Sequence, residues 1–201
     1  NNMYLIKCPD DLMIKAEQYL YSEDEMKCKF GDDYFSEIIF LAGGITSCPI
    51  WQPIVIEGLK NTKCVLIDPR RDNWDVNDKT LEEEQIKWEH FHLDNSMSIV
   101  FWFPKETLCP ITLFELGKYL KSDKRLYIGC HPEYAKRNDV KIQVGLEKSN
   151  QIIHESLDDL ISEVLLDLIE KTESNRKSGR RYERNKFRST YKFPSIRYYS
   201  A

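Results

Sequence analysis

The chain has 201 residues, of which 41% are hydrophobic and 12% aromatic, so it can bury a sizeable core and is not globally disordered. Its formal net charge of −4 is unevenly spread, because residues 171–201 hold ten Lys or Arg against two Asp or Glu. The part that precedes them therefore carries a charge of about −12. This contrast predicts an acidic folded body with a basic C-terminal segment.

Six cysteines lie singly along the chain, without a CxxC pair. They predict reduced, mostly buried thiols. His90 and His92 are two residues apart on a predicted helix and so point to different sides, and we expect no metal site and no cofactor. No apolar run reaches the roughly 18 residues of a membrane span, and no signal-peptide core is visible. These features favour a cytoplasmic protein with no membrane partner.

In chain order, residues 3–35 are mixed, with a short strand pattern at 3–9 and helical spacing at Leu12, Ala16 and Leu20. From residue 37 onward, apolar runs alternate with amphipathic stretches. The runs predict strands at residues 37–44, 63–71, 98–104, 125–132 and 140–149. The stretches predict helices at residues 49–61, 80–95, 111–123 and 156–172.

This alternation predicts an α/β fold: a flavodoxin- or Rossmann-like parallel sheet of about five strands with helices on both faces. We expect an N-terminal extension over residues 1–36, an α/β domain over 37–172 and a basic aromatic C-terminal arm over 173–201. The arm mixes Arg and Lys with Tyr and Phe. That composition suits binding of single-stranded nucleic acid, and equally an arm that lies over the acidic body or a neighbouring subunit.

The second predicted helix, at residues 80–95, shows a start signal and an amphipathic spacing. Thr80 is predicted to cap it, with Glu83 completing a capping box. Ile86, His90 and Leu93 are expected to lie on one face of this helix.

The stretch 109–119 places Glu115 inside an apolar run. The apolar residues expected in the core here are Ile111, Leu113, Phe114 and Leu116. A bare buried carboxylate costs several kcal/mol unless it is paired or takes part in chemistry. Glu115 is therefore either paired, for instance with Lys118, or functional.

The predicted carboxyl ends of the strands indicate where a ligand would bind, because open α/β sheets bind ligands at that edge. The four strand ends that carry glycine, proline or charge are residues 42–44, 68–71, 103–107 and 129–132. The side chain of Glu115 leans toward the start of its helix and hence toward this edge. Cys109, near the same helix start, is expected to have a lowered pKa. No GxGxxG, P-loop or GxSxG motif occurs, so the best-placed candidate for chemistry is Glu115.

Several segments together resemble the nucleoside 2-deoxyribosyltransferase-like proteins, over about residues 37–170. These segments are IIFLAGGI, LIDPRR, EEQIKWE, SIVFWFPKETLCPITLFELGKY and YIGCHPEYAKRNDVKIQ. The resemblance implies that Glu115 attacks the sugar C1′ of a nucleoside and forms a glycosyl ester, as a carboxylate does in glycosyl transfer. It also implies a homo-oligomer, and relatives of the fold hydrolyse nucleoside monophosphates instead.

The resemblance and the strand ends together give a candidate site. The catalytic candidates are Glu115 and Asp94. The substrate-binding candidates are Gly43, Gly44, Ile45, Trp51, Pro69, Arg70, Arg71, Trp88, Phe103, Thr107, Cys109 and His131. The tryptophans and Phe103 would form a stacking wall for the base, and an arginine would hold a phosphate. For Trp88, Arg70, Arg71 and His131, a purely structural role remains an alternative.

The chain departs from the family pattern at two positions, where aspartates are replaced by Ser98 and Cys109. Asp94 is close in sequence and is a candidate to compensate. Two alternatives to an enzyme therefore stay open. One is a nucleotide-binding module on the same fold that has lost catalysis, and the other is nucleic-acid binding through the basic tail.

Overall fold

A computed structural model describes residues 3–10, 37–72, 75 and 78–178, with side chains as far as Glu173. The predicted helical spacing at Leu12, Ala16 and Leu20, and the predicted arm from residue 179 onward, lie outside the described residues. Within the described part, no helix has the length and apolar character to cross a membrane.

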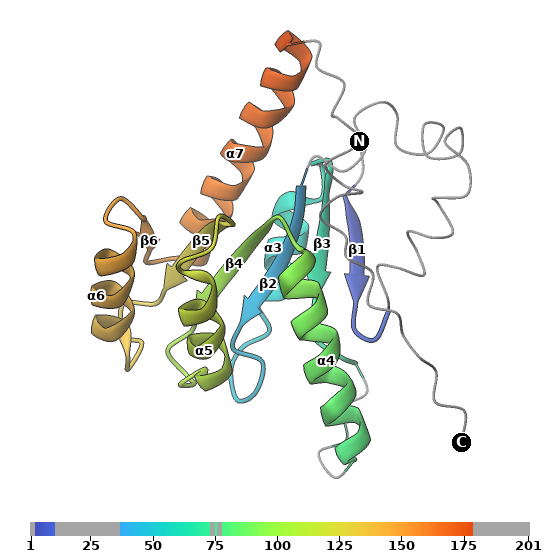
Figure 1. Ribbon diagram of the computed structural model, residues 1–201, viewed down its shortest axis with the longest axis vertical. Coiled ribbons are helices and arrows are strands. Elements are labelled where there is room, and N and C mark those ends of the chain that lie inside the picture. Colours follow the sequence, from blue (N-terminus) through green and yellow to red (C-terminus); the bar gives the residue numbers. More distant parts are fainter. Residues whose placement is uncertain (1–2, 11–36, 73–74, 76–77, 179–201) are drawn as a thin grey trace.

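Six strands form one parallel sheet in the order β1-β3-β2-β4-β5-β6 (Figure 1). Their bounds are β1 Tyr4–Lys7, β2 Glu37–Gly43, β3 Cys64–Asp68, β4 Ser98–Phe103, β5 Arg125–Cys130 and β6 Ile153–His154. The predicted α/β fold with a parallel sheet is thus confirmed, with one strand more than expected. The short strand β1 lies in the predicted N-terminal extension, and it pairs with β3 at the edge of the same sheet.

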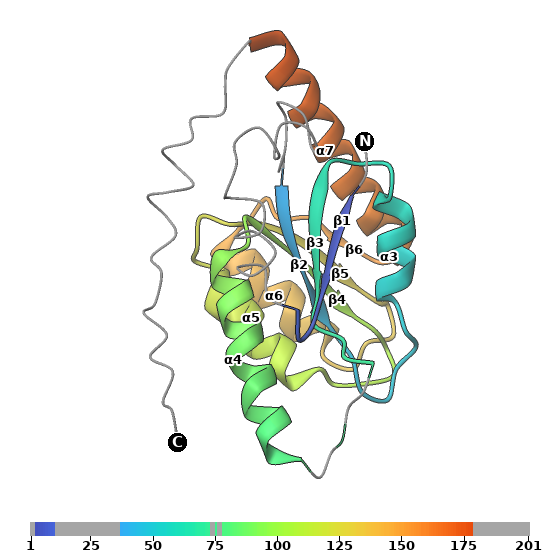
Figure 2. The same ribbon diagram turned by 90° about the vertical axis from the view of Figure 1, so that its right-hand side faces the viewer.

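Helices cover both faces of the sheet (Figure 2). Their bounds are α3 Gln52–Leu59, α4 Lys79–Asn95, α5 Pro110–Tyr119, α6 Arg137–Glu147 and α7 Leu157–Ser178. Helices α3 and α7 pack on one apolar cluster, which includes Leu41, Val100 and Tyr127. Helices α4, α5 and α6 pack on the other, which includes Phe40 and Phe101. Alternate strand residues feed the two clusters, which is why the strands are apolar throughout.

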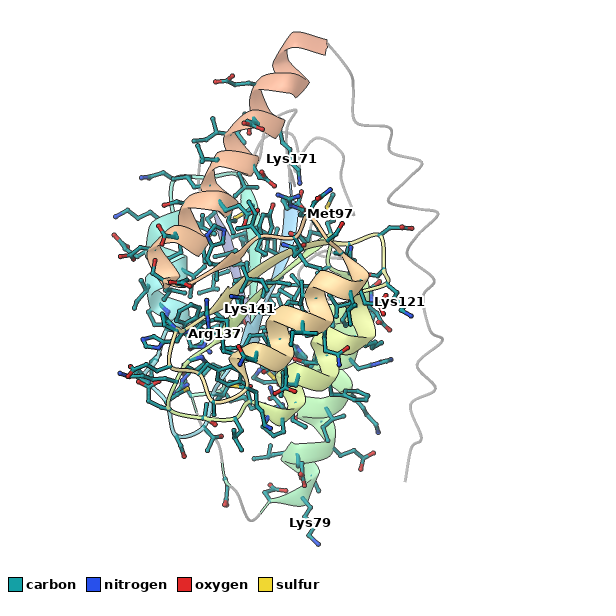
Figure 3. The ribbon with its side chains drawn as sticks, turned by 90° about the vertical axis from the view of Figure 1, so that its left-hand side faces the viewer. Lys79, Met97, Lys121, Arg137, Lys141 and Lys171 are labelled. Atoms are coloured by element: carbon teal, nitrogen blue, oxygen red, sulfur yellow. The ribbon has the colours of Figure 1, made fainter. Side chains whose placement is uncertain are left out.

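The chain leaves the central strand β2 toward β3 and then returns to the other side of β2 to form β4. This reversal makes the carboxyl ends of β2 and β4 the switch point, where α/β folds bind ligands. The first turns of α4 extend beyond these strand ends (Figure 1). Figure 3 shows Lys79, the first residue of α4, well separated from Met97, which precedes β4 at the opposite edge of the sheet.

The strand predicted over residues 140–149 is wrong, because this stretch forms most of helix α6. Val140 and Val144 are buried and Ile142, midway between them, is exposed. Apolar residues at every second position also satisfy a four-residue spacing, so the pattern fits one face of a helix as well as a strand. The boundary predicted at residue 173 falls inside α7, which continues to Ser178.

Two further predictions, the cap of α4 and the core face of α5, are also wrong in part. Asp78, not Thr80, caps α4, since its carboxylate accepts from the backbone N–H groups of Thr80 and Leu81. The inward face of α4 is formed by Gln85, Trp88, His92 and Leu93, while Ile86 and His90 are exposed.

In α5 the apolar residues Ile111 and Phe114 are 64% and 74% exposed. Leu113 is half-buried and Leu116 is buried, so only the latter part of the predicted core face is confirmed. Glu115 itself belongs to the buried face. The helix therefore turns apolar side chains to solvent and a carboxylate inward, which is the reverse of what burial alone would favour.

Candidate functional site

The loop after β2 lies directly against the loop that connects β4 to α5. A Cβ added to Gly44 would lie 2.8 Å from Pro104 Cγ, 2.9 Å from Thr107 Cγ2 and 3.1 Å from Cys109 Sγ. Trp51 Nε1 donates to the carbonyl oxygen of Gly44 at 2.8 Å and locks the loop from its other end. The structure thus brings together four predicted site residues, since only a glycine permits this approach.

Gly43 lies against the ring of Trp51, whose side chain is buried among the residues of the α3 side. Trp51 thereby holds the loop, and its face does not form an open wall. On the other side of the loop, Arg70 Nη1 donates to the carbonyl oxygen of Ile45 at 3.2 Å. The ends of β2, β3 and β4 are therefore tied into one edge.

Cys109 caps α5 in the left-handed region, with φ of 45°. Its side chain is buried beside Gly44. Burial raises the pKa of this thiol to about 12, so the expected lowering at a helix start is wrong. The described cysteines are all free, and four of the five are buried.

Glu115 is 9% exposed on the sheet-facing side of α5. Burial raises its pKa to about 8, the negative charge of Glu89 adds to this, and Lys118 acts in the opposite direction. The ammonium of Lys118 binds Asp94 at 2.8 Å instead. Among the described residues, none forms a hydrogen bond or ion pair with the carboxylate of Glu115. Pairing with Lys118 thus does not explain why this carboxylate is buried.

Glu89 of α4 is the second carboxylate of this region, and the sequence motifs did not reveal it. Gln85 Nε2 donates to Glu89 Oε1 at 2.6 Å and to the carbonyl oxygen of Pro69 at 2.7 Å. Burial raises the pKa of Glu89. Because one amide nitrogen bridges both oxygens, Glu89 lies at the end of β3, on the carboxyl edge. One signal in the sequence could have indicated Glu89. It lies four residues after Gln85, so the two side chains are neighbours on the helix, near the face that also carries Trp88.

The side chain of Arg71 is held by hydrogen bonds to Gln85 and Glu84 of α4. Its Nε donates to Gln85 Oε1 at 2.7 Å and its Nη2 to Glu84 at 2.7 Å, with Cys8 Sγ also 3.2 Å from Nε. The side chain is 6% exposed. Arg71 therefore fixes the orientation of Gln85.

Asp94 does not join the carboxyl edge. It lies near the end of α4 and accepts from Lys118 and from the hydroxyl of Tyr119, and His90 Nε2 lies 3.3 Å away. These partners belong to the last turn of α5 and the last turns of α4. The structure thus joins Asp94 to the end of α5 that lies away from Cys109.

The remaining predicted site residues are largely packed into the fold. Trp88 packs against His92 with ring centroids 4.1 Å apart, and its Nε1 donates to the carbonyl oxygen of Asp10. Phe103 is fully buried, with its ring centroid 5.3 Å from that of Tyr134. His131 is half-buried at the end of β5, where its backbone N–H donates to the carbonyl of Phe103 and its Nδ1 accepts from the N–H of Glu133.

Two further observations limit the chemistry of this edge. The described residues contain no group of three or more His, Cys, Asp or Glu arranged to hold a metal ion. Ser98, one of the two departures from the family pattern, begins β4 at the amino edge, and its buried Oγ has no hydrogen-bond partner. A side chain at this position cannot reach a ligand at the carboxyl edge, so Cys109 is the departure that bears on the site.

The fold and this edge define an α/β protein of the Rossmann-like class. A buried carboxylate, unpaired among the residues that the structure describes, lies on the helix that follows the switch point of the sheet. Residues 36–134, about half of the chain, match the family model described as nucleoside 2-deoxyribosyltransferase like. The match confirms the resemblance to this family that the sequence motifs indicate. The match contains β2 to β5 together with α3, α4 and α5, and so both Glu89 and Glu115. No curated protein matches the chain.

Proposed function

We propose that this protein cleaves or transfers at the N-glycosidic bond of a nucleoside or nucleoside monophosphate, with Glu115 as the nucleophile. The observation that carries the proposal is a buried carboxylate that has no hydrogen-bond or ion-pair partner among the described residues, located on the helix that follows the switch-point strand β4. The family match over residues 36–134 supports a nucleoside as the substrate. The other carboxylates of this edge, Asp68 and Glu89, each accept a hydrogen bond from a described residue.

The chemistry matches the electrostatics of the site. Breaking the bond from C1′ to the base leaves positive charge on the sugar, which an adjacent carboxylate stabilises and then captures as an ester. Glu115 must be ionised to do so, yet its pKa of about 8 keeps most of it protonated at pH 7 in the empty site. Positive charge that develops at C1′ favours the ionised form. Glu115 would thus supply its negative charge as positive charge develops on the sugar.

A base-release screen tests the proposal. The full-length protein is incubated with ribo- and 2-deoxyribonucleosides and their monophosphates, with and without a second free base, and products are identified by mass spectrometry. Release or exchange of base is expected from at least one substrate, and Glu115→Gln should abolish it. Glu82→Gln, which alters an exposed carboxylate of α4, is the matched control. Full turnover by Glu115→Gln would overturn the assignment.

Trapping locates the nucleophile directly. A 2-fluoro analogue of the cleaved substrate slows the breakdown of the ester, so the sugar should stay attached to the peptide that contains Glu115. The same adduct must be absent from Glu115→Gln. Attachment to another residue would transfer the role to that residue.

A binding module without catalysis is the second candidate. It is favoured by the same pKa of about 8, because a neutral carboxyl group at pH 7 can donate a hydrogen bond to a ligand, and by Cys109 at a position where the family pattern has an aspartate. Tight nucleotide binding by calorimetry, without base release over hours, would support this candidate against the enzyme.

A further inference from the structure

The carboxylate of Glu89 is held in a defined orientation. Gln85 lies between Arg71 and Glu89, and a guanidinium nitrogen can only donate, so the Gln85 oxygen accepts from Arg71. The amide nitrogen of Gln85 must then be the atom that faces Glu89. Glu89 Oε1 is therefore an acceptor. When Glu89 is protonated, its proton resides on the other oxygen, Oε2.

Glu89 also acts on the proposed nucleophile through its charge. Its negative charge is the largest charge effect on the carboxyl group of Glu115. The contact of His90 with Lys118, 3.4 Å between Nδ1 and Nζ, aligns the same turns of α4 and α5. Two neighbouring carboxyl groups that are both withdrawn from water cannot readily ionise together, so the pair retains a proton at neutral pH.

We propose that Glu89 is the second carboxylate of the glycosyl-transfer site: it donates the Oε2 proton to the leaving base, and then takes a proton from the acceptor, water or a second base. This inference rests on the proposed function of Glu115. It assigns proton transfer to Glu89, whereas the sequence offered Asp94 as the residue that compensates for the missing aspartates. Asp94 is occupied by Lys118 and Tyr119, whereas Glu89 lies at the carboxyl edge.

The two steps balance. The first step starts from the state in which Glu115 is ionised and the proton that the pair retains lies on Glu89. An oxygen of Glu115 forms a bond to C1′, the bond from C1′ to the base nitrogen breaks with its electron pair on the base, and the Glu89 proton moves to the base. In the second, the Glu89 carboxylate removes a proton from water or from the N–H of a second base. That acceptor then bonds to C1′, and the ester to Glu115 breaks. Both carboxyl groups return to their starting states.

The test uses full-length protein and a series of substrates that share one sugar but carry leaving bases of different basicity. The variant Glu89→Gln keeps the shape and the contact with Gln85 but has no proton to donate. Its base release should fall by about 10²- to 10⁴-fold for the most basic leaving base, and by less than about tenfold for the least basic. Glu115→Gln should lose activity on the whole series alike.

Two additional variants keep the test decisive. Glu83→Gln, which alters an exposed carboxylate of α4 that pairs with Lys87, should leave the whole series unchanged. Glu89→Asp retains a proton and should recover part of the loss on basic leaving groups. Equal loss across the series in Glu89→Gln, or no loss, overturns the role of Glu89 while Glu115 keeps its own. If the wild-type protein releases no base from any substrate, the proposed function itself fails.

Discussion

Gly44 and Cys109 meet across the switch point of the sheet: a Cβ on Gly44 would lie 3.1 Å from the sulfur of Cys109. The contact joins the loop after β2 to the start of α5, so it sets the distance between the strand ends and the helix that carries Glu115. The geometry of the candidate site therefore depends on the absence of a side chain at residue 44.

Gly44→Ala should destabilise the protein by about 1–3 kcal/mol, because the added methyl group overlaps side-chain atoms of Pro104, Thr107 and Cys109. The displaced loop should also lower base release more than the loss of stability explains. Urea unfolding measures the first effect and the base-release assay the second.

Gly117→Ala is the matched control for this change. Gly117 lies within α5, and an added Cβ would meet no atom within 4 Å. Alanine there should stabilise the helix by about 0.5–1 kcal/mol. Equal effects at Gly44 and Gly117 would show that the close approach at Gly44 carries no strain.

Glu115 should make the protein less stable as the pH rises. Its pKa is about 8 when folded, against an ordinary value of 4.5 that applies to the unfolded chain, so the folded state binds more protons between these values. The free energy of unfolding should therefore fall from pH 5 to pH 8.5, at up to about 1.4 kcal/mol per pH unit. Glu115→Gln should remove most of this fall, as measured by urea unfolding at both pH values.

Other groups titrate in the same range, so the variant must be compared with wild type at each pH. Glu82→Gln serves as the control with an exposed side chain on α4. A wild-type stability that is flat or rising from pH 5 to pH 8.5, with no difference from Glu115→Gln, would mean that Glu115 is ionised at neutral pH in the empty site.

The fold was predictable because its signals are local. Runs such as residues 37–44 and 98–104 are apolar at nearly every position, and a parallel sheet covered on both faces buries such strands. The assignment failed at residues 140–149, where the spacing of Val140 and Val144 suits either element. Whether this stretch forms a helix or a strand depends on which of its residues are buried, and burial depends on the tertiary structure.

A residue of the candidate site was predictable only where its own position in the chain placed it at the carboxyl ends of the strands, the edge where open α/β sheets bind ligands. Glu115 could be located because it follows the switch-point strand. Glu89 could not, since its position depends on Gln85 reaching the carbonyl of Pro69, 16 residues earlier in the chain. Asp94 was chosen for its nearness in sequence, and the turns of α4 carry it toward the other end of α5.

His92 should make the free energy of unfolding rise with pH, whereas Glu115 should make it fall. It is fully buried beside Trp88, neither ring nitrogen has a hydrogen-bond partner, and burial lowers its pKa to about 4. The unfolded state binds the extra proton between pH 4 and pH 6.5, so stability rises with pH across this window. His92→Leu should remove that rise and stabilise the protein by about 1–3 kcal/mol, because two unpaired polar atoms are no longer buried.

Thermal unfolding at pH 4.5 and pH 6.5 measures this prediction. His90→Leu is the comparison, since His90 is exposed on the same helix. If His92→Leu loses stability at both pH values, the ring fills its space better than leucine and the unpaired nitrogens carry little cost.

Asp94→Asn should leave base release within about threefold of wild type while changing stability only slightly. Partial burial would raise the pKa of Asp94, but the hydrogen bonds from Lys118 and Tyr119 outweigh it and hold the pKa below its ordinary value. The group is partly exposed, so the loss of its ion pair should cost less than about 1 kcal/mol, and that contribution should itself disappear as the pH falls through the pKa of Asp94.

Base release by Asp94→Asn and Glu89→Gln, measured side by side, identifies which acidic residue moves the proton. A large loss in Asp94→Asn that depends on the basicity of the leaving base would return that role to Asp94.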